Sequence, residues 1–267
     1  MRKNIVLMLA SSLLFACGGE EPAAPGGTSS AGTAAPPAAP QASAPAPAAT
    51  QPQATQAPTA APQRMTQAER EAVIANRQYQ EGRNYTRLTP AQPTLETDAD
   101  RVEVVEFFQY SCPACNNFEP YVQAWKASAA AYVNFVRLPA QGNQLSELHA
   151  RAYYTASTLG IAEESHQAFF DEFHRNRNYM QTEAEVAEFY SQFGVDEETF
   201  LSTFNSFAVH TRMQRGRDMI ERYRVSGTPQ IVVAGKYTIT GAQAGSYDDW
   251  FGIIDELAAV EWANVEE

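Results

Sequence analysis

The chain has 267 residues, of which 44% are hydrophobic, and a formal net charge of −12 at pH 7. This length suits one ordinary folded domain with extensions. The acidic balance provides no basic patch of the kind that binds nucleic acid, so we expect no nucleic-acid partner.

The chain begins with the features of an export signal. Met1-Arg-Lys gives a basic start, and residues 5–15 form an apolar run that is too short to span a bilayer. The segment Leu14-Phe-Ala-Cys17-Gly then resembles the bacterial lipobox, although Phe15 departs from the small residues usual there. We therefore expect residues 1–16 to be a lipoprotein signal peptide and Cys17 to carry a lipid anchor. The alternative is a conventional signal peptide, with Cys17 removed or left as an incidental thiol.

A low-complexity segment follows the predicted anchor. Residues 20–64 contain no aromatic residue, Val, Ile or Leu, and they hold ten of the sixteen prolines. Such a composition cannot build a hydrophobic core, so we expect residues 17–64 to be a disordered tether and residues 65–267 to be the folded domain. Gly18 is not the aspartate associated with retention at the inner membrane, which leaves the inner and the outer membrane open.

The folded part is expected to start with a short helix over residues 66–77 and an edge strand over residues 85–88. Residues 102–108 then form a β-branched and aromatic run that only Glu103 and Glu106 interrupt. This pattern predicts a strand that is covered on both faces.

A Cys-x-x-Cys motif, Cys112-Pro-Ala-Cys115, follows this strand directly. Pro113 suits the first position of a helix, which makes Cys112 the N-cap, facing the unpaired amides and the positive end of the helix dipole. That position stabilises a thiolate. Cys115 lies one turn further on the same helix face, within reach of Cys112 and more buried. We therefore predict a pair that cycles between dithiol and disulfide, separated by Pro113 and Ala114.

The rest of the domain is predicted from hydrophobic periodicity and turn residues. We expect a helix over residues 113–131 with a kink at Pro120, a strand over 133–138, a helical block over 141–223, a hairpin of 231–233 with 237–240, and a last helix over 247–257. Thr182 and Glu185 form a predicted capping box. Two helical stripes are expected to pack inward: Leu145, Leu148, Ala152, Ala156 and Leu159, and then Val209, Met213, Gly216, Ile220 and Tyr223.

This order of elements predicts an α/β protein, the thioredoxin fold with an inserted α-helical domain. The sequence also resembles the DsbA family of bacterial periplasmic thiol:disulfide oxidoreductases. The resemblance rests on Glu106-Phe-Phe, Cys112-Pro-Ala-Cys115, Phe118-Glu119, Phe193-Gly-Val-Asp, and Thr228-Pro229 followed by Ile231-Val-Val and Gly235-Lys. It implies a thioredoxin core over about 79–138 and 225–260, with the helical insertion over about 140–223.

The resemblance also implies roles for the site residues. Cys112 is the attacking thiol and Cys115 closes the internal disulfide, while Glu106 helps to move the proton of the buried cysteine. Glu119 matches a second family acid, but a solvated helix residue is an equal alternative. Pro229 matches the family's cis-proline, which implies that the backbone of Thr228 lies beside Cys112, where a client strand can pair with it.

Other readings of the cysteine pair are weaker. A fixed disulfide across so short a loop adds little stability. Histidines at 149, 166, 174 and 210 lack the spacing of a zinc site, and Asn116 excludes c-type haem attachment. We expect these histidines to be surface or packing residues, and we expect no metal or cofactor.

Two departures from the family bear on the direction of exchange. The prototype has histidine where this chain has Ala114, and valine where it has Thr228. We therefore expect a weaker oxidant than the prototype, since one stabiliser of the thiolate is lost.

Three functions compete. The favoured one is a monomeric dithiol oxidase that acts on reduced, unfolded exported proteins in the periplasm and is recycled by a membrane, quinone-linked partner of the DsbB type. The second is an isomerase or reductase of the same fold, which the lack of an apolar dimerisation pattern in the leader disfavours. The third is a surface lipoprotein that binds partners without redox chemistry, which the retention of both cysteines, Glu106 and Thr228-Pro229 disfavours.

Overall fold

The computed structural model describes residues 62–95 and 100–265. The predicted signal peptide, Cys17 and the tether up to residue 61 lie outside the described residues. The described elements are α1 (Gln67–Ala75), β1 (Thr86–Arg87), β2 (Val102–Phe108), α2 (Pro113–Lys126), β3 (Val133–Pro139), α3 (Gln144–Thr158), α4 (Ala162–His174), α5 (Glu183–Ser191), α6 (Glu197–Phe204), α7 (Phe207–Arg222), β4 (Gln230–Val233), β5 (Tyr237–Thr240), α8 (Gly241–Ala244) and α9 (Tyr247–Ala263).

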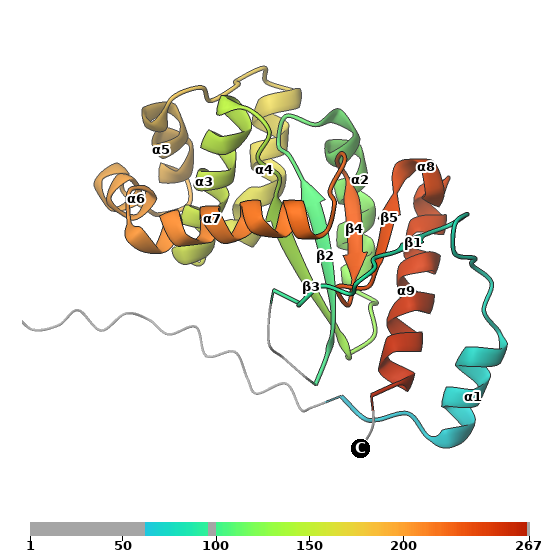
Figure 1. Cartoon of the computed structure of the whole chain (residues 1–267). Helices are drawn as coiled ribbons and strands as arrows, with labels where there is room; N and C mark the ends of the chain where they lie inside the picture. Colours follow the sequence, from blue (N-terminus) through green and yellow to red (C-terminus); the bar gives the residue numbers. More distant parts are fainter. Residues whose placement is uncertain (1–61, 96–99, 266–267) are drawn as a thin grey trace, which may run out of the picture. The chain divides into compact units, whose positions relative to one another are not determined.

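The strands form a five-stranded sheet in the order β1-β5-β4-β2-β3 (Figure 1). β2 pairs in parallel with β3 and antiparallel with β4. Every residue of β2 is buried, which confirms the predicted strand covered on both faces. Because β2 and β3 are parallel, their carboxyl ends lie at the same edge of the sheet, where α2 and α3 begin.

Helices cover both faces of the sheet. One hydrophobic cluster joins Val104 and Ile231 to α2 and α9, through Phe118 and Ile253 among others. A second joins Phe107 on the opposite face to the end of α7. The sheet therefore lies between helices on both sides, and β2 contributes side chains to both clusters.

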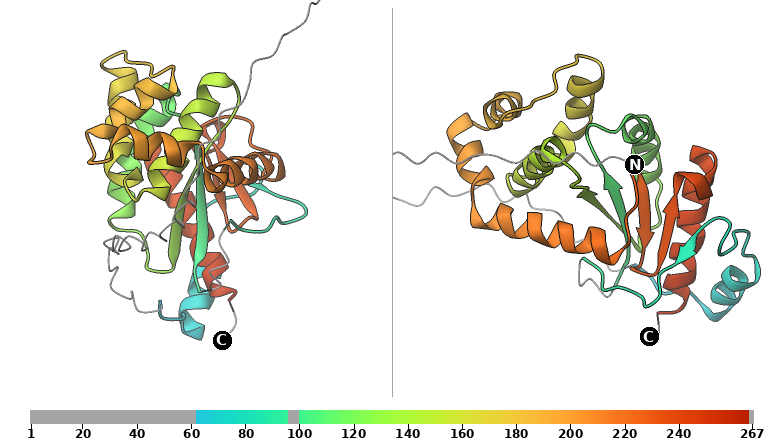
Figure 2. Two further views of the ribbon diagram at one scale, coloured as in Figure 1. Left: turned by 90° about the vertical axis from the view of Figure 1, so that its left-hand side faces the viewer. Right: turned by 45° about the horizontal axis from the view of Figure 1, so that its top comes forward.

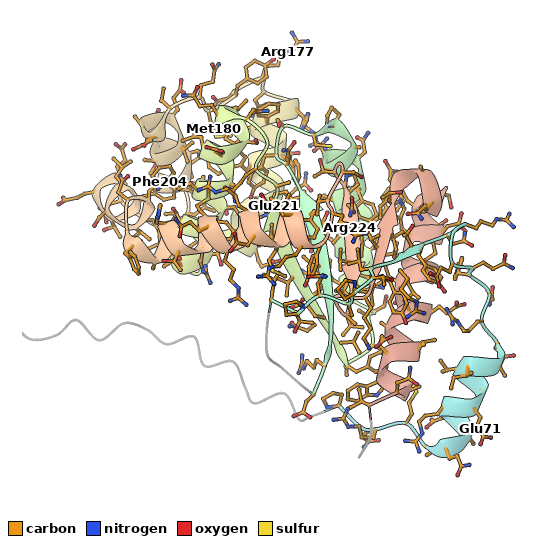
Figure 3. All side chains as sticks on the ribbon, in the orientation of Figure 1. Glu71, Arg177, Met180, Phe204, Glu221 and Arg224 are labelled. Atoms are coloured by element: carbon orange, nitrogen blue, oxygen red, sulfur yellow. The ribbon has the colours of Figure 1, made fainter. Side chains whose placement is uncertain are left out.

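Helices α3 to α7 lie between β3 and β4 in the chain and have a core of their own. Figure 1 shows α3 to α6 gathered beside the sheet, and Figure 2 shows α7, in orange, running from this group back to the sheet. Met180 belongs to this core, whereas Arg177 points outward at the top of the view in Figure 3. The same core includes Tyr110 and Cys115, so the inserted helices pack against the cysteine motif.

Local signals in the sequence predicted several ends of elements correctly. Thr182 and Glu185 form the expected capping box at the start of α5. The hairpin between β4 and β5 turns at Ala234 (φ 52°) and Gly235 (φ 62°), both in the left-handed region. A Cβ on Gly235 would lie 2.1 Å from the carbonyl oxygen of Gln92, so only glycine fits there.

Other elements differ from the prediction because tertiary packing sets their ends. α2 ends at Lys126 rather than near residue 131, since the chain must turn back into β3. α9 continues to Ala263 rather than 257, because its last turns are buried and Trp262 stacks on Tyr132 at 5.3 Å. The predicted stripe of α3 is confirmed in large part: Ala152 and Ala156 are buried in the core, and Leu148 and Leu159 pack against it, while Leu145 is only partly buried. Bulkier side chains of α3, such as Tyr153, also face the core.

Candidate active site

Cys112 lies at the N-cap of α2, directly after β2, as the sequence predicted. Its backbone is extended (φ −87°, ψ 115°), and Pro113 follows in the first turn of the helix. The backbone N–H of Cys115 donates to Cys112 Sγ at 3.4 Å. The thiol therefore occupies the position at which a helix N-terminus stabilises negative charge.

The surroundings of Cys112 favour its thiolate. The hydrogen bond from the Cys115 side chain contributes most, and it lowers the pKa of Cys112 from 9.0 to about 5, with help from the Thr228 side chain and the amides of Cys115 and Ala114. Partial burial of the sulfur opposes this shift. Cys112 is consequently ionised at neutral pH and reactive as a nucleophile.

Cys115 has the opposite environment. Its side chain is buried, at 1% exposure, and this burial, together with the hydrogen bond to Cys112, raises its pKa above the ordinary value. Both cysteines are free thiols in this structure. The two sulfurs thus differ in access and in acidity, with Cys112 as the one that a client can reach.

The loop before β4 completes the surroundings of Cys112. The peptide bond between Thr228 and Pro229 is cis, and the Cys112 thiol donates to the carbonyl oxygen of Thr228 at 3.3 Å. The backbone of Thr228 therefore lies beside the reactive sulfur although 116 residues separate them in the chain. Pro113 and Ala114 are both exposed, which leaves the approach to the motif open.

Glu106 is buried in the central strand, at 1% exposure. The pKa of Glu106 is raised to about 7, mainly by burial. The positive charge of Arg137 opposes this rise, and the negative charge of the nearby Glu119 adds to it. Glu106 also contributes to the raised pKa of Cys115, which places its carboxyl within electrostatic reach of that thiol. A carboxyl with a pKa near 7 can both donate and accept a proton at physiological pH.

Arg137 is the buried cation that the sequence analysis missed. It pairs with Glu106 across the β2–β3 ladder, and its Nε lies 3.4 Å from Glu106 Oε2. Its two other nitrogens lie 2.8 Å from carboxylate oxygens of Glu119 and of Glu163. Burial opposes the charge of Arg137, but these carboxylates outweigh it and raise its pKa. A detectable signal was the arginine inside a strand otherwise rich in apolar residues.

The structure also decides between the two alternatives for Glu119. Its side chain is 1% exposed, so the reading as a solvated helix residue is wrong. Gln123 donates to its carboxylate at 2.5 Å, and His166 Nε2 lies 3.4 Å away. Burial opposes ionisation of Glu119, but His166 and Arg137 outweigh it and lower its pKa. Glu119 faces inward because α2 packs against both β3 and α4.

His166 extends this cluster into the inserted helices. Burial and the charge of Arg137 lower the pKa of His166 to about 4, so His166 is neutral at pH 7. The positive charge that holds Glu119 ionised at this pH is therefore that of Arg137. The Nε2 of His166 faces the Glu119 carboxylate, and its Nδ1 shares a hydrogen bond of 2.9 Å with the Tyr110 hydroxyl. His149 and His166 are buried, while His174 is half-buried and His210 exposed. Within residues 62–95 and 100–265, no group of three or more His, Cys, Asp and Glu side chains is arranged to hold a metal ion.

Comparisons with known proteins agree with this geometry. Residues 123–246 match a family model described as a DSBA-like thioredoxin domain. The chain is 35% identical to the thiol:disulfide interchange protein DsbA of Pseudomonas aeruginosa over 185 residues, which cover 69% of this chain and 87% of that protein. It is 33% identical to the DsbA of Azotobacter vinelandii over 180 residues, covering 67% and 83% of the two chains.

Solved structures give the same result. The crystal structure of Pseudomonas aeruginosa DsbA matches with a TM-score of 0.66 and 34% identity, over 71% of this chain and 97% of that one. The oxidoreductase DsbA from Xylella fastidiosa matches with a TM-score of 0.65 and 34% identity, over 69% and 98%. The family-model match begins after the cysteine motif, so the roles of Cys112 and Cys115 rest on the site geometry.

Proposed function

Since this chain belongs to the DsbA family of thiol:disulfide interchange proteins, we propose that it introduces disulfide bonds into exported proteins through Cys112 and Cys115. The predicted thioredoxin fold with inserted helices is the fold of this family and is confirmed. The observation that carries the proposal is the acidic Cys112 thiol at the start of α2, beside the carbonyl oxygen of Thr228.

The proposed reaction is thiol–disulfide exchange in two steps. A client thiolate attacks Cys112 Sγ of the oxidised protein, a mixed disulfide forms, and Cys115 leaves as a thiolate that takes up a proton. A second client thiolate then attacks the client sulfur of the mixed disulfide, and Cys112 leaves as a thiolate. The low pKa of Cys112 favours this second step, because a more acidic thiol is a better leaving group.

We assign the proton transfer at Cys115 to Glu106. Cys115 has a raised pKa and is buried, so its thiolate needs a proton donor inside the protein. Glu106 has a pKa of about 7 and is buried beside Arg137. In this proposal Arg137 and Glu119 are positioning residues, which keep the pKa of Glu106 near neutrality rather than touching the client.

Client capture is assigned to the loop at Thr228 and Pro229. An extended client segment that pairs with the backbone of Thr228 would bring its own cysteine to Cys112.

The departures at Ala114 and Thr228 bear on redox potential, and we expect a weaker oxidant than the family prototype. An isomerase or reductase, or a binding module without redox chemistry, is not favoured for a chain in this family.

We further propose that the protein acts in the periplasm, anchored through Cys17 on the inner or the outer membrane, with the signal peptide, tether and folded domain divided as the sequence predicts. The proline-rich tether would let a monomeric domain reach clients and a DsbB-type recycling partner in the membrane. Within the part of the chain that the structure describes, no helix is long and apolar enough to cross a membrane.

Two experiments test this function. The oxidised protein should oxidise a reduced, unfolded client faster than glutathione alone, and Cys115→Ser should accumulate mixed disulfides that Cys112→Ser cannot form. Failure of the wild type to react with the client would contradict the proposal, and reduction or reshuffling without net oxidation would favour the isomerase or reductase. Metabolic labelling with a fatty acid should tag the wild type but not Cys17→Ala, and a tagged variant would contradict the anchor.

A further inference from the structure

A pocket of ≈170 Å³ with a mixed, mostly apolar lining lies away from the cysteine motif, beside the edge strand β3 and between α3 and α7. Its polar lining consists of Arg137, Tyr153, Tyr154, Ser157, Arg212 and Arg215. No Asp or Glu lines it among the residues that the structure describes. Arg137 is occupied by its three carboxylate partners, so Arg212 and Arg215 are the cations that this pocket offers a ligand.

The two tyrosines supply hydrogen-bond donors to this pocket. Burial raises the pKa of Tyr153 and of Tyr154, so both hydroxyls keep their protons at neutral pH. No hydrogen bond joins either hydroxyl to a residue that the structure describes, and Tyr153 and Tyr154 keep 8% and 9% of their surface exposed. Their protons are consequently available to a ligand.

Gly216 keeps room for one of these hydroxyls. A Cβ at this position in α7 would lie 2.6 Å from the hydroxyl oxygen of Tyr154 and 3.1 Å from Gln141 Nε2. Glycine inside a helix costs about 1 kcal/mol relative to alanine. The predicted role of Gly216 as one member of an apolar stripe therefore accounts for its burial but not for its contact with a phenol.

The two arginines of α7 have donors to spare. Arg212 donates to Ser157 Oγ at 3.0 Å, and Arg215 donates to the carbonyl oxygen of Leu95. Neither forms an ion pair with a described residue, whereas Arg217 on the same helix pairs with Glu147 at 3.5 Å. Each guanidinium carries five N–H donors, so most of those on Arg212 and Arg215 remain unused by the described protein.

We propose that this pocket binds a small oxyanion, of phosphate size or a carboxylate group, a function that does not depend on thiol exchange. Cations and protonated hydroxyls converge there, and charge-assisted hydrogen bonds to oxyanions are the strong ones. The volume of ≈170 Å³ equals about six water molecules, and it lies below the roughly 300 Å³ at which pockets for drug-sized ligands begin.

The bound anion would be coupled to the active site through Arg137. Tyr153 lines the pocket, and the charges of Arg137 and of Arg212 both act on its phenol. Arg137 also neutralises Glu106 and Glu119. A negative charge in the pocket would oppose ionisation of the buried carboxyls and so raise the pKa of Glu106.

Titration of the purified full-length chain with inorganic phosphate tests the proposal, with chloride added to constant ionic strength and calorimetry as the readout. We expect saturable binding at one site and an affinity at least about tenfold lower in Arg212→Gln/Arg215→Gln, since charge-assisted hydrogen bonds are lost. Tyr154→Phe should weaken binding less. Arg217→Gln is the matched control, and it should bind as the wild type does.

Other outcomes are equally decisive. Absent binding, or binding that the double arginine variant retains, would overturn the proposal. Phosphate binding that appears only after Glu96→Gln/Asp98→Asn would likewise overturn the proposal, since the wild type would then bind no external anion. Acetate as a competing titrant tells whether a carboxylate suffices. Binding only to vesicles that contain phosphatidylglycerol, with no binding of free phosphate, would also count against the proposed small ligand.

Discussion

The acidic thiol at Cys112 should make the stability of the reduced protein depend on pH in a way that the oxidised protein cannot share. The pKa of Cys112 falls from 9.0 to about 5 in the fold. A group whose pKa is lowered on folding stabilises the folded state fully above its unfolded pKa, and this stabilisation is lost as the pH falls through the folded pKa. The relevant window therefore runs from about pH 9 down to pH 5. A disulfide has no thiolate and no such dependence.

The magnitude follows from the size of the shift. Each unit between the pH and the folded pKa of about 5 is worth roughly 1.4 kcal/mol. Allowing for solvent screening at a sulfur that is only partly buried, the thiolate contributes about 2 kcal/mol at pH 7 and about 3 kcal/mol at pH 8. Closing a loop of only four residues gives a stabilisation at the low end for disulfides, about 2 kcal/mol, and it is the same at every pH. The reduced form should thus be the less stable at pH 5 and the more stable at pH 8.

Calorimetric melting of the full-length chain, reduced and oxidised in parallel between pH 5 and pH 8, measures this difference. The gap in melting temperature should change by about 6–12 °C across the range, since 1 kcal/mol corresponds to about 2–4 °C for a domain of this size. Glu106 titrates in both forms, so its contribution largely cancels in the comparison. Reduced Cys112→Ser should lose the dependence.

Parallel melting curves for the two redox forms would refute the reasoning, because they would mean that Cys112 is not ionised near neutral pH. The ultraviolet absorbance of the thiolate provides an independent check. It should titrate near pH 5 in the wild type and at higher pH in Cys115→Ala, since the side chain of Cys115 supplies the largest stabilising hydrogen bond.

Three further predictions concern the buried cluster and the start of the domain. Arg137→Met should cost about 3–5 kcal/mol in denaturant unfolding, because it leaves buried carboxylates uncompensated; a loss under about 1 kcal/mol would contradict the pairing. Glu163→Gln frees Arg137 for its two buried partners. The pKa of Glu106, about 7 in the wild type, should therefore be lower in this variant when it is measured by infrared titration. Glu164→Gln, a change at the exposed neighbouring position, should leave that pKa unchanged. A chain starting at Met65 should fold and keep its thiol chemistry, but it should be less stable by about 1 kcal/mol than a chain starting at Pro62. The shorter chain lacks Gln63 and Arg64, which both contact Trp262 of α9. Equal stability of the two chains would show that these contacts contribute nothing.

Much of the active site could be predicted from the sequence because its signals are local. The N-cap position of Cys112 follows from a proline directly after it at the end of a buried strand. The hairpin at Gly235 follows from turn residues between two apolar runs. The proposed lipid anchor at Cys17 rests on the sequence alone.

The approach of Thr228 to Cys112 came from family resemblance rather than from any local pattern. The two residues are 116 positions apart, so only the fold can bring them together. The structure then supplied the observation that decides the chemistry, the 3.3 Å contact between the Cys112 sulfur and the Thr228 carbonyl oxygen.

The electrostatics of the buried cluster were decided by tertiary structure. Glu106 meets Arg137 only because β2 and β3 pair in that register, and a shift by one residue would send one of the two side chains to the opposite face. The sequence was equally compatible with a buried and with a solvated Glu119, because it does not say which face of α2 packs against α4. His166 joins the cluster from the inserted helices. A sequence determines what a residue can do locally, whereas burial and charge partners, which set its pKa, depend on segments that only the folded chain brings together.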